Sequence, residues 1–117
     1  MEKHPININK AKYIVDGDRE LLKELVQIFM ETYPGLLERV EEAITQQETS
    51  SFRHETHQIK GALRNFAAEP AQLAASELES ADVRGDPQQV KEKLENLKTE
   101  LAVLETYFRS GELEKQL

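Results

Sequence analysis

The stretch GDPQQVKEKLENLKTELAVLETYF, residues 85–108, carries the clearest structural signal in the chain. Gly85, Asp86 and Pro87 supply in turn a helix stop, an N-cap and a first-position proline. The apolar residues that follow recur at alternating intervals of four and three: Val90, Leu94, Leu97, Leu101, Leu104 and Phe108. A seam of this kind lets one side of a long helix pack against other helices. We therefore expect a helix from residue 87 to about residue 109 within a helical bundle.

Three further amphipathic segments precede this helix. Asp18 is a good N-cap, and apolar residues recur at helical spacing from Leu21 to Tyr33. Pro34 and Gly35 interrupt the pattern, yet it resumes and runs to Ile44, so the segment is either one kinked helix or two helices joined end to end. Residues 46–51 are expected to be a loop. Helices are then expected over 51–67 and from Pro70 to about Arg84.

These segments predict an all-α fold, an antiparallel up-down four-helix bundle over residues 18–109. Residues 1–17 are expected to form an arm or short helix on the core, and residues 110–117 a tail, with the whole chain, residues 1–117, as a single domain. The arm residues expected to contact the core are Ile6, Ile8, Tyr13, Ile14 and Val15.

Composition excludes several classes of function. The chain has 117 residues and no cysteine, which removes disulfides, thiolate chemistry and cysteine-ligated metals. No apolar run approaches the roughly 20 residues that a membrane-spanning helix needs, and the N-terminus lacks a secretory signal. We therefore expect a cytoplasmic protein. A net charge of −7 argues against nucleic acid and anionic membranes as partners.

The segment 51–67 holds the candidate site. On a helical wheel, one arc contains Phe52, Thr56, Ile59, Leu63 and Phe66 and should face the core. The opposite face contains His57 and, within roughly 60° of it, Arg53, His54, Lys60, Gly61 and Arg64. The sequence thus predicts an exposed His57 in a basic stripe, with no acidic residue on the same arc of this helix.

This arrangement suits a nucleophilic imidazole that handles an anion. With an ordinary pKa near 6.5, an exposed imidazole is largely neutral at physiological pH and attacks phosphorus without a dedicated base. Lys60 lies one turn after His57 and can hold an anion on the ring, and Gly61 leaves room for a partner surface. His57 is therefore the candidate phosphoryl acceptor.

The residues His57, Gln58, Ile59, Lys60 and Gly61 resemble the signature His-x-(Leu or similar)-Lys-Gly of the histidine-containing phosphotransfer (HPt) family. Two further stretches are also similar to parts of that family: residues 17–29 (GDRELLKELVQIF), and residues 65–68 (NFAA) followed by Leu73, Ala74, Leu78 and Glu79. Three positions depart from the common pattern: Thr56 and Ala62 replace a usual Ala and Ser, and Ala67 replaces a frequent Gly. Ala67 is expected to need ordinary backbone angles.

The resemblance implies a phosphorelay intermediate. His57 would carry a phosphoryl group exchanged with the aspartate of a response-regulator receiver domain, and Lys60 would stabilise that group. The partners would be this receiver domain and a hybrid sensor histidine kinase, docking on Arg53, His54, Gly61, Arg64 and Ala68. The protein would be a phosphocarrier without ATP-dependent kinase activity and without a cofactor of its own, since the receiver domain would supply Mg²⁺.

Other interpretations of the same residues remain open. His54 and His57 lie one turn apart and could ligate a metal, although bundle metal sites usually add carboxylates from facing helices, and no metal is expected. The basic residues could be an ordinary solvated face. The leading alternative function is a bundle that binds receiver domains, or another protein, without being phosphorylated. The Leu seam is expected to serve the bundle core, so a monomer is expected.

Overall fold

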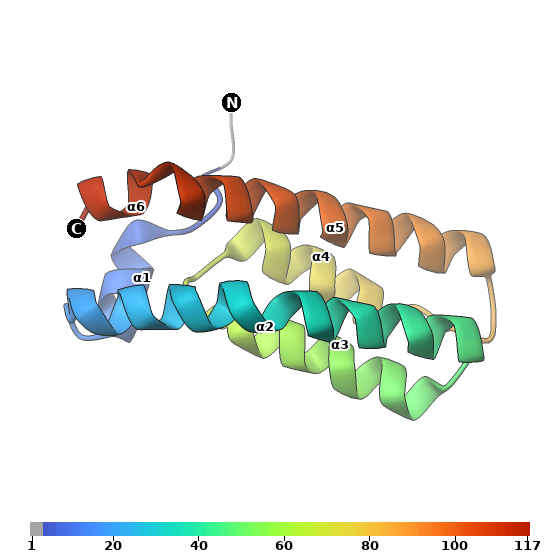
Figure 1. Cartoon of the computed structure of the whole chain (residues 1–117). Coiled ribbons are helices and arrows are strands. Elements are labelled where there is room, and N and C mark those ends of the chain that lie inside the picture. Colours follow the sequence, from blue (N-terminus) through green and yellow to red (C-terminus); the bar gives the residue numbers. More distant parts are fainter. Residues whose placement is uncertain (1–3) are drawn as a thin grey trace.

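The computed structural model describes residues 4–117, and within this range the chain forms helices and no strand (Figure 1). The helices are α1 (Ile8–Ile14), α2 (Arg19–Gln46), α3 (Thr49–Arg64), α4 (Glu69–Glu79), α5 (Pro87–Ser110) and α6 (Glu112–Lys115). The predicted all-α class is confirmed.

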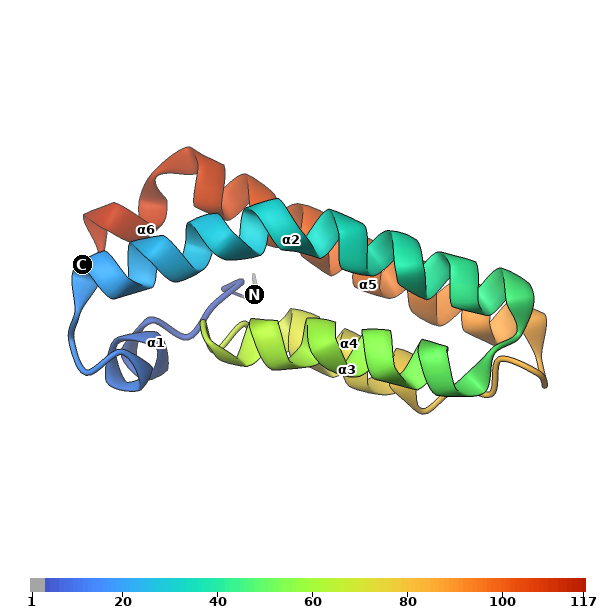
Figure 2. The ribbon, with the colours of Figure 1, turned by 60° about the horizontal axis from the view of Figure 1, so that its bottom comes forward.

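Four of these helices build the bundle. Helices α2 to α5 each pack against the next one along the chain, and α5 closes the set by contacting α2. Figure 2 shows α2 and α5 as one layer and α3 and α4 as the other, with α1 and α6 at the same end of the molecule. The short connections make consecutive helices antiparallel, as the sequence predicts.

Helix α2 is one continuous helix, which decides between the two possibilities left open by the sequence. Asp18 caps it by accepting a hydrogen bond from the Leu21 N–H at 3.0 Å, and it ends at Gln47, which has a left-handed φ of 53°. Pro34 lies inside it and is exposed. Buried residues on both sides of the proline, Leu22 and Phe29 before it and Val40 after it, hold both halves on the same core.

Several predicted boundaries were wrong. The expected loop over 46–51 is confined to residues 47 and 48, and the site helix runs over Thr49–Arg64 instead of 51–67. Helix α4 ends at Glu79 instead of Arg84. The segment beyond it is a turn in which the Asp82 side chain accepts a hydrogen bond from the Arg84 N–H at 3.0 Å. Val83 is nevertheless buried, so an apolar residue signals burial here without signalling helix.

The expectation that Ala67 has ordinary backbone angles was also wrong. Ala67 is buried and has a φ of 48°, in the left-handed region that disfavours residues with a Cβ. It lies in the tight connection between α3 and α4. The Asn7 N–H donates a hydrogen bond of 2.9 Å to the Ala67 carbonyl. The reversal of the chain imposes this conformation, which explains why a glycine would fit the position.

The two ends of the chain differ in part from expectation. Residues 1–3 of the expected arm lie outside the described residues. Ile6 and Val15 are buried, but Tyr13 is 86% exposed and Ile14 47% exposed, so those two do not pack on the core. The expected tail contains α6, whose Leu113 is buried.

An aromatic cluster joins α2, α5 and the turn after α3 near the end of the bundle that carries α1. The rings of Phe29, Phe66 and Phe108 pack edge to face, with centroid separations of 5.3 to 6.3 Å. Tyr33 stacks on Phe29 and donates its hydroxyl proton to Glu105 at 2.6 Å. This cluster fixes α2 and α5 against Phe66, which lies in the turn that follows the site helix.

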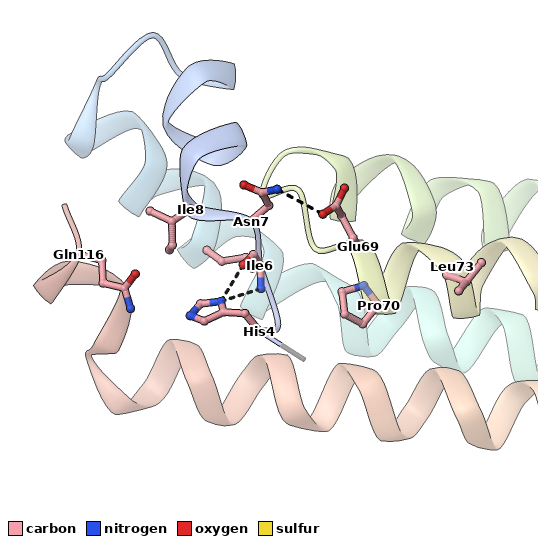
Figure 3. A pocket seen from close by; sticks show the side chains of 8 residues that line it. All are labelled: His4, Ile6, Asn7, Ile8, Glu69, Pro70, Leu73 and Gln116. Atoms are coloured by element: carbon pink, nitrogen blue, oxygen red, sulfur yellow. Dashed lines mark hydrogen bonds between the residues drawn. The ribbon is translucent and has the colours of Figure 1, made fainter. Parts of the chain in front are cut away.

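A hollow of about 590 Å³ lies at the same end, between the N-terminal arm, the start of α4 and α6 (Figure 3). Its walls include Ile6, Pro70 and Leu73, and His4 lies across it with Nδ1 at 2.7 Å from the Ile6 carbonyl. None of its lining residues belongs to α3, so this hollow is separate from His57.

Candidate functional site

The buried face of α3 positions the site. Phe52, Ile59 and Leu63 are fully buried, as the helical wheel predicts. Thr56 is buried beside them, and its hydroxyl donates to the Phe52 carbonyl at 2.7 Å, so the polar atom is satisfied within the helix. With this face fixed against the core, the opposite face is presented to solvent. The His57 side chain is 59% exposed.

A carboxylate from the neighbouring helix meets His57. Glu79, the last residue of α4, places Oε1 at 2.6 Å from Lys60 Nζ and Oε2 at 3.3 Å from His57 Nδ1. The side chains of Lys60 and Glu79 are only 15% and 23% exposed. His57, Lys60 and Glu79 thus form a cluster across the α3–α4 interface, with the imidazole on its outer side.

The carboxylate of Glu79 selects the tautomer of the His57 imidazole. An ionised carboxylate only accepts hydrogen bonds, so the neutral ring that faces it carries its proton on Nδ1. The lone pair then resides on Nε2. Because His57 is mostly exposed, the site combines a nucleophilic nitrogen with access for a partner.

Glu79 is ionised at neutral pH. Its pKa is lowered, chiefly by the hydrogen bond from Lys60; the charge of Lys60 adds to this effect, as does the charge of His57 when the ring is protonated. Partial burial acts in the opposite direction and does not cancel it. The pair of Lys60 and Glu79 is therefore a charged pair, in which a short charge-assisted hydrogen bond holds the ammonium group beside the imidazole.

One expectation about the basic stripe was wrong, and another is true of α3 alone. Lys60 does not lie free on the solvent face, because its ammonium group is turned toward α4 and paired with Glu79. The absence of acidic residues holds only for α3 itself, since Glu79 reaches the same place from α4. The other predicted members of the stripe, Arg53, His54 and Arg64, are exposed.

Gly61 and Ala68, both predicted for docking, differ sharply in their surroundings. A Cβ built on Gly61 would meet no heavy atom within 4 Å, so the surface beside this residue is open. Ala68 is fully buried and cannot contact a docked partner, which contradicts its predicted place in the docking surface. It follows the left-handed Ala67 into the core at the start of α4, where the wheel of α3 no longer applies.

Among residues 4–117, no three or more histidine and acidic side chains gather closely enough to hold a metal ion. Over the same residues, no helix combines the length and apolarity required to cross a bilayer.

Comparison with known protein families supplies a finding independent of this geometry. The Hpt domain model matches residues 24–115, a span that begins within α2 and includes all three members of the cluster. The chain belongs to the Hpt domain family. Hpt domains serve histidine phosphotransfer in two-component phosphorelays, and this general role therefore applies to the chain.

A solved Hpt domain has the same fold. The chain is similar to the crystal structure of the HPT domain from the Hpt sensor hybrid histidine kinase from Shewanella, with a TM-score of 0.66 and 22% sequence identity. The similarity covers 91% of this chain and 96% of that one. The search of curated proteins found no match. The N-terminal arm and α1 precede the span matched by the family model. That residues 1–117 form one domain stays a prediction.

Sequence reasoning missed Glu79 as a member of the candidate site. The wheel of α3 could not find it, because it belongs to another helix. A signal was present nonetheless: Leu78 and Glu79 lie in the segment after the NFAA stretch that is similar to the family. The buried Leu78 points into the core, so the next residue, about 100° further round the helix, lies at the edge of that face.

Proposed function

We propose that Nε2 of His57 is the phosphoryl carrier of this Hpt domain and exchanges the group with the aspartate of a response-regulator receiver domain. The observation that carries the proposal is the exposed His57 with Nδ1 facing Glu79 and Lys60 alongside. Family membership supports the general role. The assignment of residues is ours.

The transfer is a displacement at phosphorus. The Nε2 lone pair of neutral His57 attacks the phosphorus of an aspartyl phosphate, the N–P bond forms, and the P–O bond to the partner's aspartate breaks. The aspartate leaves as a carboxylate, and the ring, which keeps its Nδ1 proton, becomes a phosphoimidazolium facing Glu79. The reverse sequence returns the group to a receiver domain. No deprotonating base is required, since the attacking nitrogen has no proton.

The remaining catalytic groups belong to the partner. Lys60 offers one ammonium group to the phosphoryl oxygens, and the receiver domain supplies its own acidic residues and Mg²⁺. In this proposal the protein has no cofactor and no ATP-dependent kinase activity, and it works as a monomer in the cytoplasm. A hybrid sensor histidine kinase is the proposed source of phosphoryl groups for the relay.

The docking surface in this proposal is the exposed face of α3, with Arg53, His54, Gly61 and Arg64. Gly61 is the most informative of these residues. A glycine inside a helix costs about 1 kcal/mol relative to alanine, and here it does not make room for any neighbouring atom of the chain. The missing side chain of Gly61 therefore makes room only for a partner that approaches the surface of α3.

The decisive experiment is phosphotransfer to a His57→Gln variant. The unsubstituted protein, incubated with a receiver domain phosphorylated on its aspartate, is expected to acquire an acid-labile, base-stable label. The His57→Gln variant should acquire none, whereas His4→Gln, which changes an exposed histidine of the N-terminal arm outside the docking surface, should be labelled normally. ATP alone should label none of the three proteins. Full labelling of His57→Gln would overturn the assignment.

The alternative is an adaptor that binds receiver domains without carrying a phosphoryl group. The same experiment separates the two functions. An adaptor would bind the receiver domain with unchanged affinity in the His57→Gln variant, and even the unsubstituted protein would remain unlabelled.

A further inference from the structure

The carboxylate of Glu79 lies where a negative charge is unfavourable, and the transfer reaction alone does not explain why it is there. Glu79 is the last residue of α4, where the helix dipole disfavours a negative charge, and the last turn of α4 contains no basic residue. Lys60 compensates from α3 with a hydrogen bond of 2.6 Å. The carboxylate therefore depends on Lys60, while a phosphoryl group on His57 would require the same ammonium group.

We propose that Glu79 is a displaceable counter-ion of Lys60, occupying the ammonium group while His57 is unphosphorylated and surrendering it when a phosphoryl group arrives. This inference rests on the proposed function of His57. It gives Glu79 a role in setting how readily the carrier keeps or donates its phosphoryl group.

The sign of the effect follows from counting charges. A phosphoryl group brings roughly two negative charges at neutral pH, and the imidazolium ring contributes at most one positive charge. The site therefore becomes more negative by at least about one charge beside an ionised Glu79. Repulsion between the two anions and the loss of the bond to Lys60 both raise the free energy of the phosphorylated form.

The contact between Glu79 and the ring opposes this effect and is the weaker one. Its distance is 3.3 Å, against 2.6 Å for the contact with Lys60, and among the causes that lower the pKa of Glu79 the hydrogen bond from His57 is the smallest. Glu79 therefore disfavours retention of the phosphoryl group overall. The domain is thereby biased toward donating it.

The test uses a Glu79→Gln variant, which keeps the shape of the side chain and removes its charge. Potassium phosphoramidate is the phosphodonor: the P–N bond to ammonia breaks, the bond to Nε2 forms, and ammonia is released. At fixed phosphoramidate and ammonia concentrations, the plateau ratio of phosphorylated to unphosphorylated His57, measured by ³¹P NMR, is expected to rise about fivefold in the variant. The lifetime of the phosphohistidine after removal of the donor should lengthen as well.

Two matched variants control the experiment. Glu77→Gln removes an exposed carboxylate of the same helix, one that pairs with Lys93 at 3.5 Å instead of with the cluster, and should leave the plateau unchanged. In a Lys60→Gln background the effect of Glu79→Gln should shrink to below half, because no ammonium group remains to be exchanged. Circular dichroism checks that each variant is folded.

The outcomes distinguish this inference from the function on which it rests. An unsubstituted protein that phosphoramidate never labels on His57 would overturn both. Normal labelling with an unchanged or lower plateau in Glu79→Gln would overturn the counter-ion role alone. A full effect in the Lys60→Gln background would show direct repulsion without exchange, and would also overturn it.

Discussion

The backbone N–H of Asn7 donates a hydrogen bond of 2.9 Å to the carbonyl of Ala67, which ties the N-terminal arm to the turn directly after the site helix. Asn7 also caps α1, its side chain accepting from the Lys10 N–H at 3.1 Å. Lys10 in turn forms an ion pair of 2.9 Å with Glu69 at the start of α4. The arm therefore braces the connection that sets α4, and with it Glu79, against α3.

The left-handed Ala67 gives the first prediction. Replacing Ala67 with Gly relieves a backbone strain of about 1 kcal/mol but removes a buried methyl group and loosens the unfolded chain, each a loss of comparable size. We expect the free energy of unfolding, measured in urea, to fall by about 1 kcal/mol or slightly less. Ala75→Gly, at a buried position inside α4, should instead destabilise by about 2 kcal/mol. Equal losses at the two positions would contradict the strain at Ala67.

A second prediction concerns the partly buried ion pair of the site. Lys60→Ala leaves the carboxylate of Glu79 without its cation, and at pH 7 we expect a loss of about 1 kcal/mol in the free energy of unfolding. Lys23→Ala, which removes an exposed partner of Glu20 at 3.7 Å, should cost less than about 0.5 kcal/mol.

The pH dependence of that loss has a definite sign. Because the folded-state pKa of Glu79 lies below its usual value of 4.5, the stability contributed by the pair is fully present above about pH 4.5. It disappears as the pH falls through the lowered pKa. The difference between the unsubstituted protein and Lys60→Ala should therefore narrow in acid. A difference that persists unchanged after the carboxylate has been protonated would show that the charged pair is not its source.

Gly61 supplies a third prediction, in which stability and function move apart. Gly61→Ala should raise the free energy of unfolding by about 1 kcal/mol, since the added methyl group meets no neighbour and alanine favours the helix. Gly61→Leu should also fold, yet slow phosphotransfer from a receiver domain at least tenfold by blocking its approach. Gly35→Leu, on α2, is the control expected to leave transfer unchanged. Equal transfer rates in all three variants would remove Gly61 from the docking surface.

Tyr33 gives a fourth prediction, at alkaline pH. Burial, the hydrogen bond to Glu105 and the charge of that carboxylate raise the pKa of Tyr33 to about 12. Below pH 10, the Tyr33→Phe variant should be less stable by about 1 kcal/mol. Between pH 10 and 12 tyrosine ionises in the unfolded chain but not in the folded one, so the unsubstituted protein should lose this advantage. Urea unfolding at pH 7, 10 and 11 tests the convergence.

The sequence predicted the elements whose signals are local. The helix over residues 87–109 was placed to within a residue of the observed end, because Asp86 and Gly111 form caps at its two ends. The exposure of His57 followed from a wheel that any amphipathic helix obeys. The family resemblance, carried by five consecutive residues from His57 to Gly61, is confirmed by the Hpt match.

What the sequence did not predict depends on contacts between segments. Glu79 belongs to the site because α4 packs beside α3, a contact that the wheel of α3 does not contain. Ala68 is buried by the same packing and is therefore absent from the docking surface. Ala67 took a left-handed conformation that its own residue type disfavours, because the reversal between the helices demands it. Ala81 and Val83 are buried although they lie outside α4, since burial and helix formation are separate requirements.

Pro34, in the middle of α2, has one more consequence. Proline lacks an amide proton, so the carbonyl of Met30 lacks its usual helical donor, and the longest helix of the bundle is interrupted there by one missing rung. We therefore expect amide hydrogen exchange to show two separately protected stretches within α2. We expect the stretch from Leu22 to Tyr33 to exchange together with the aromatic cluster that it contacts. The stretch beyond the proline leads into α3 and should exchange together with the start of that helix.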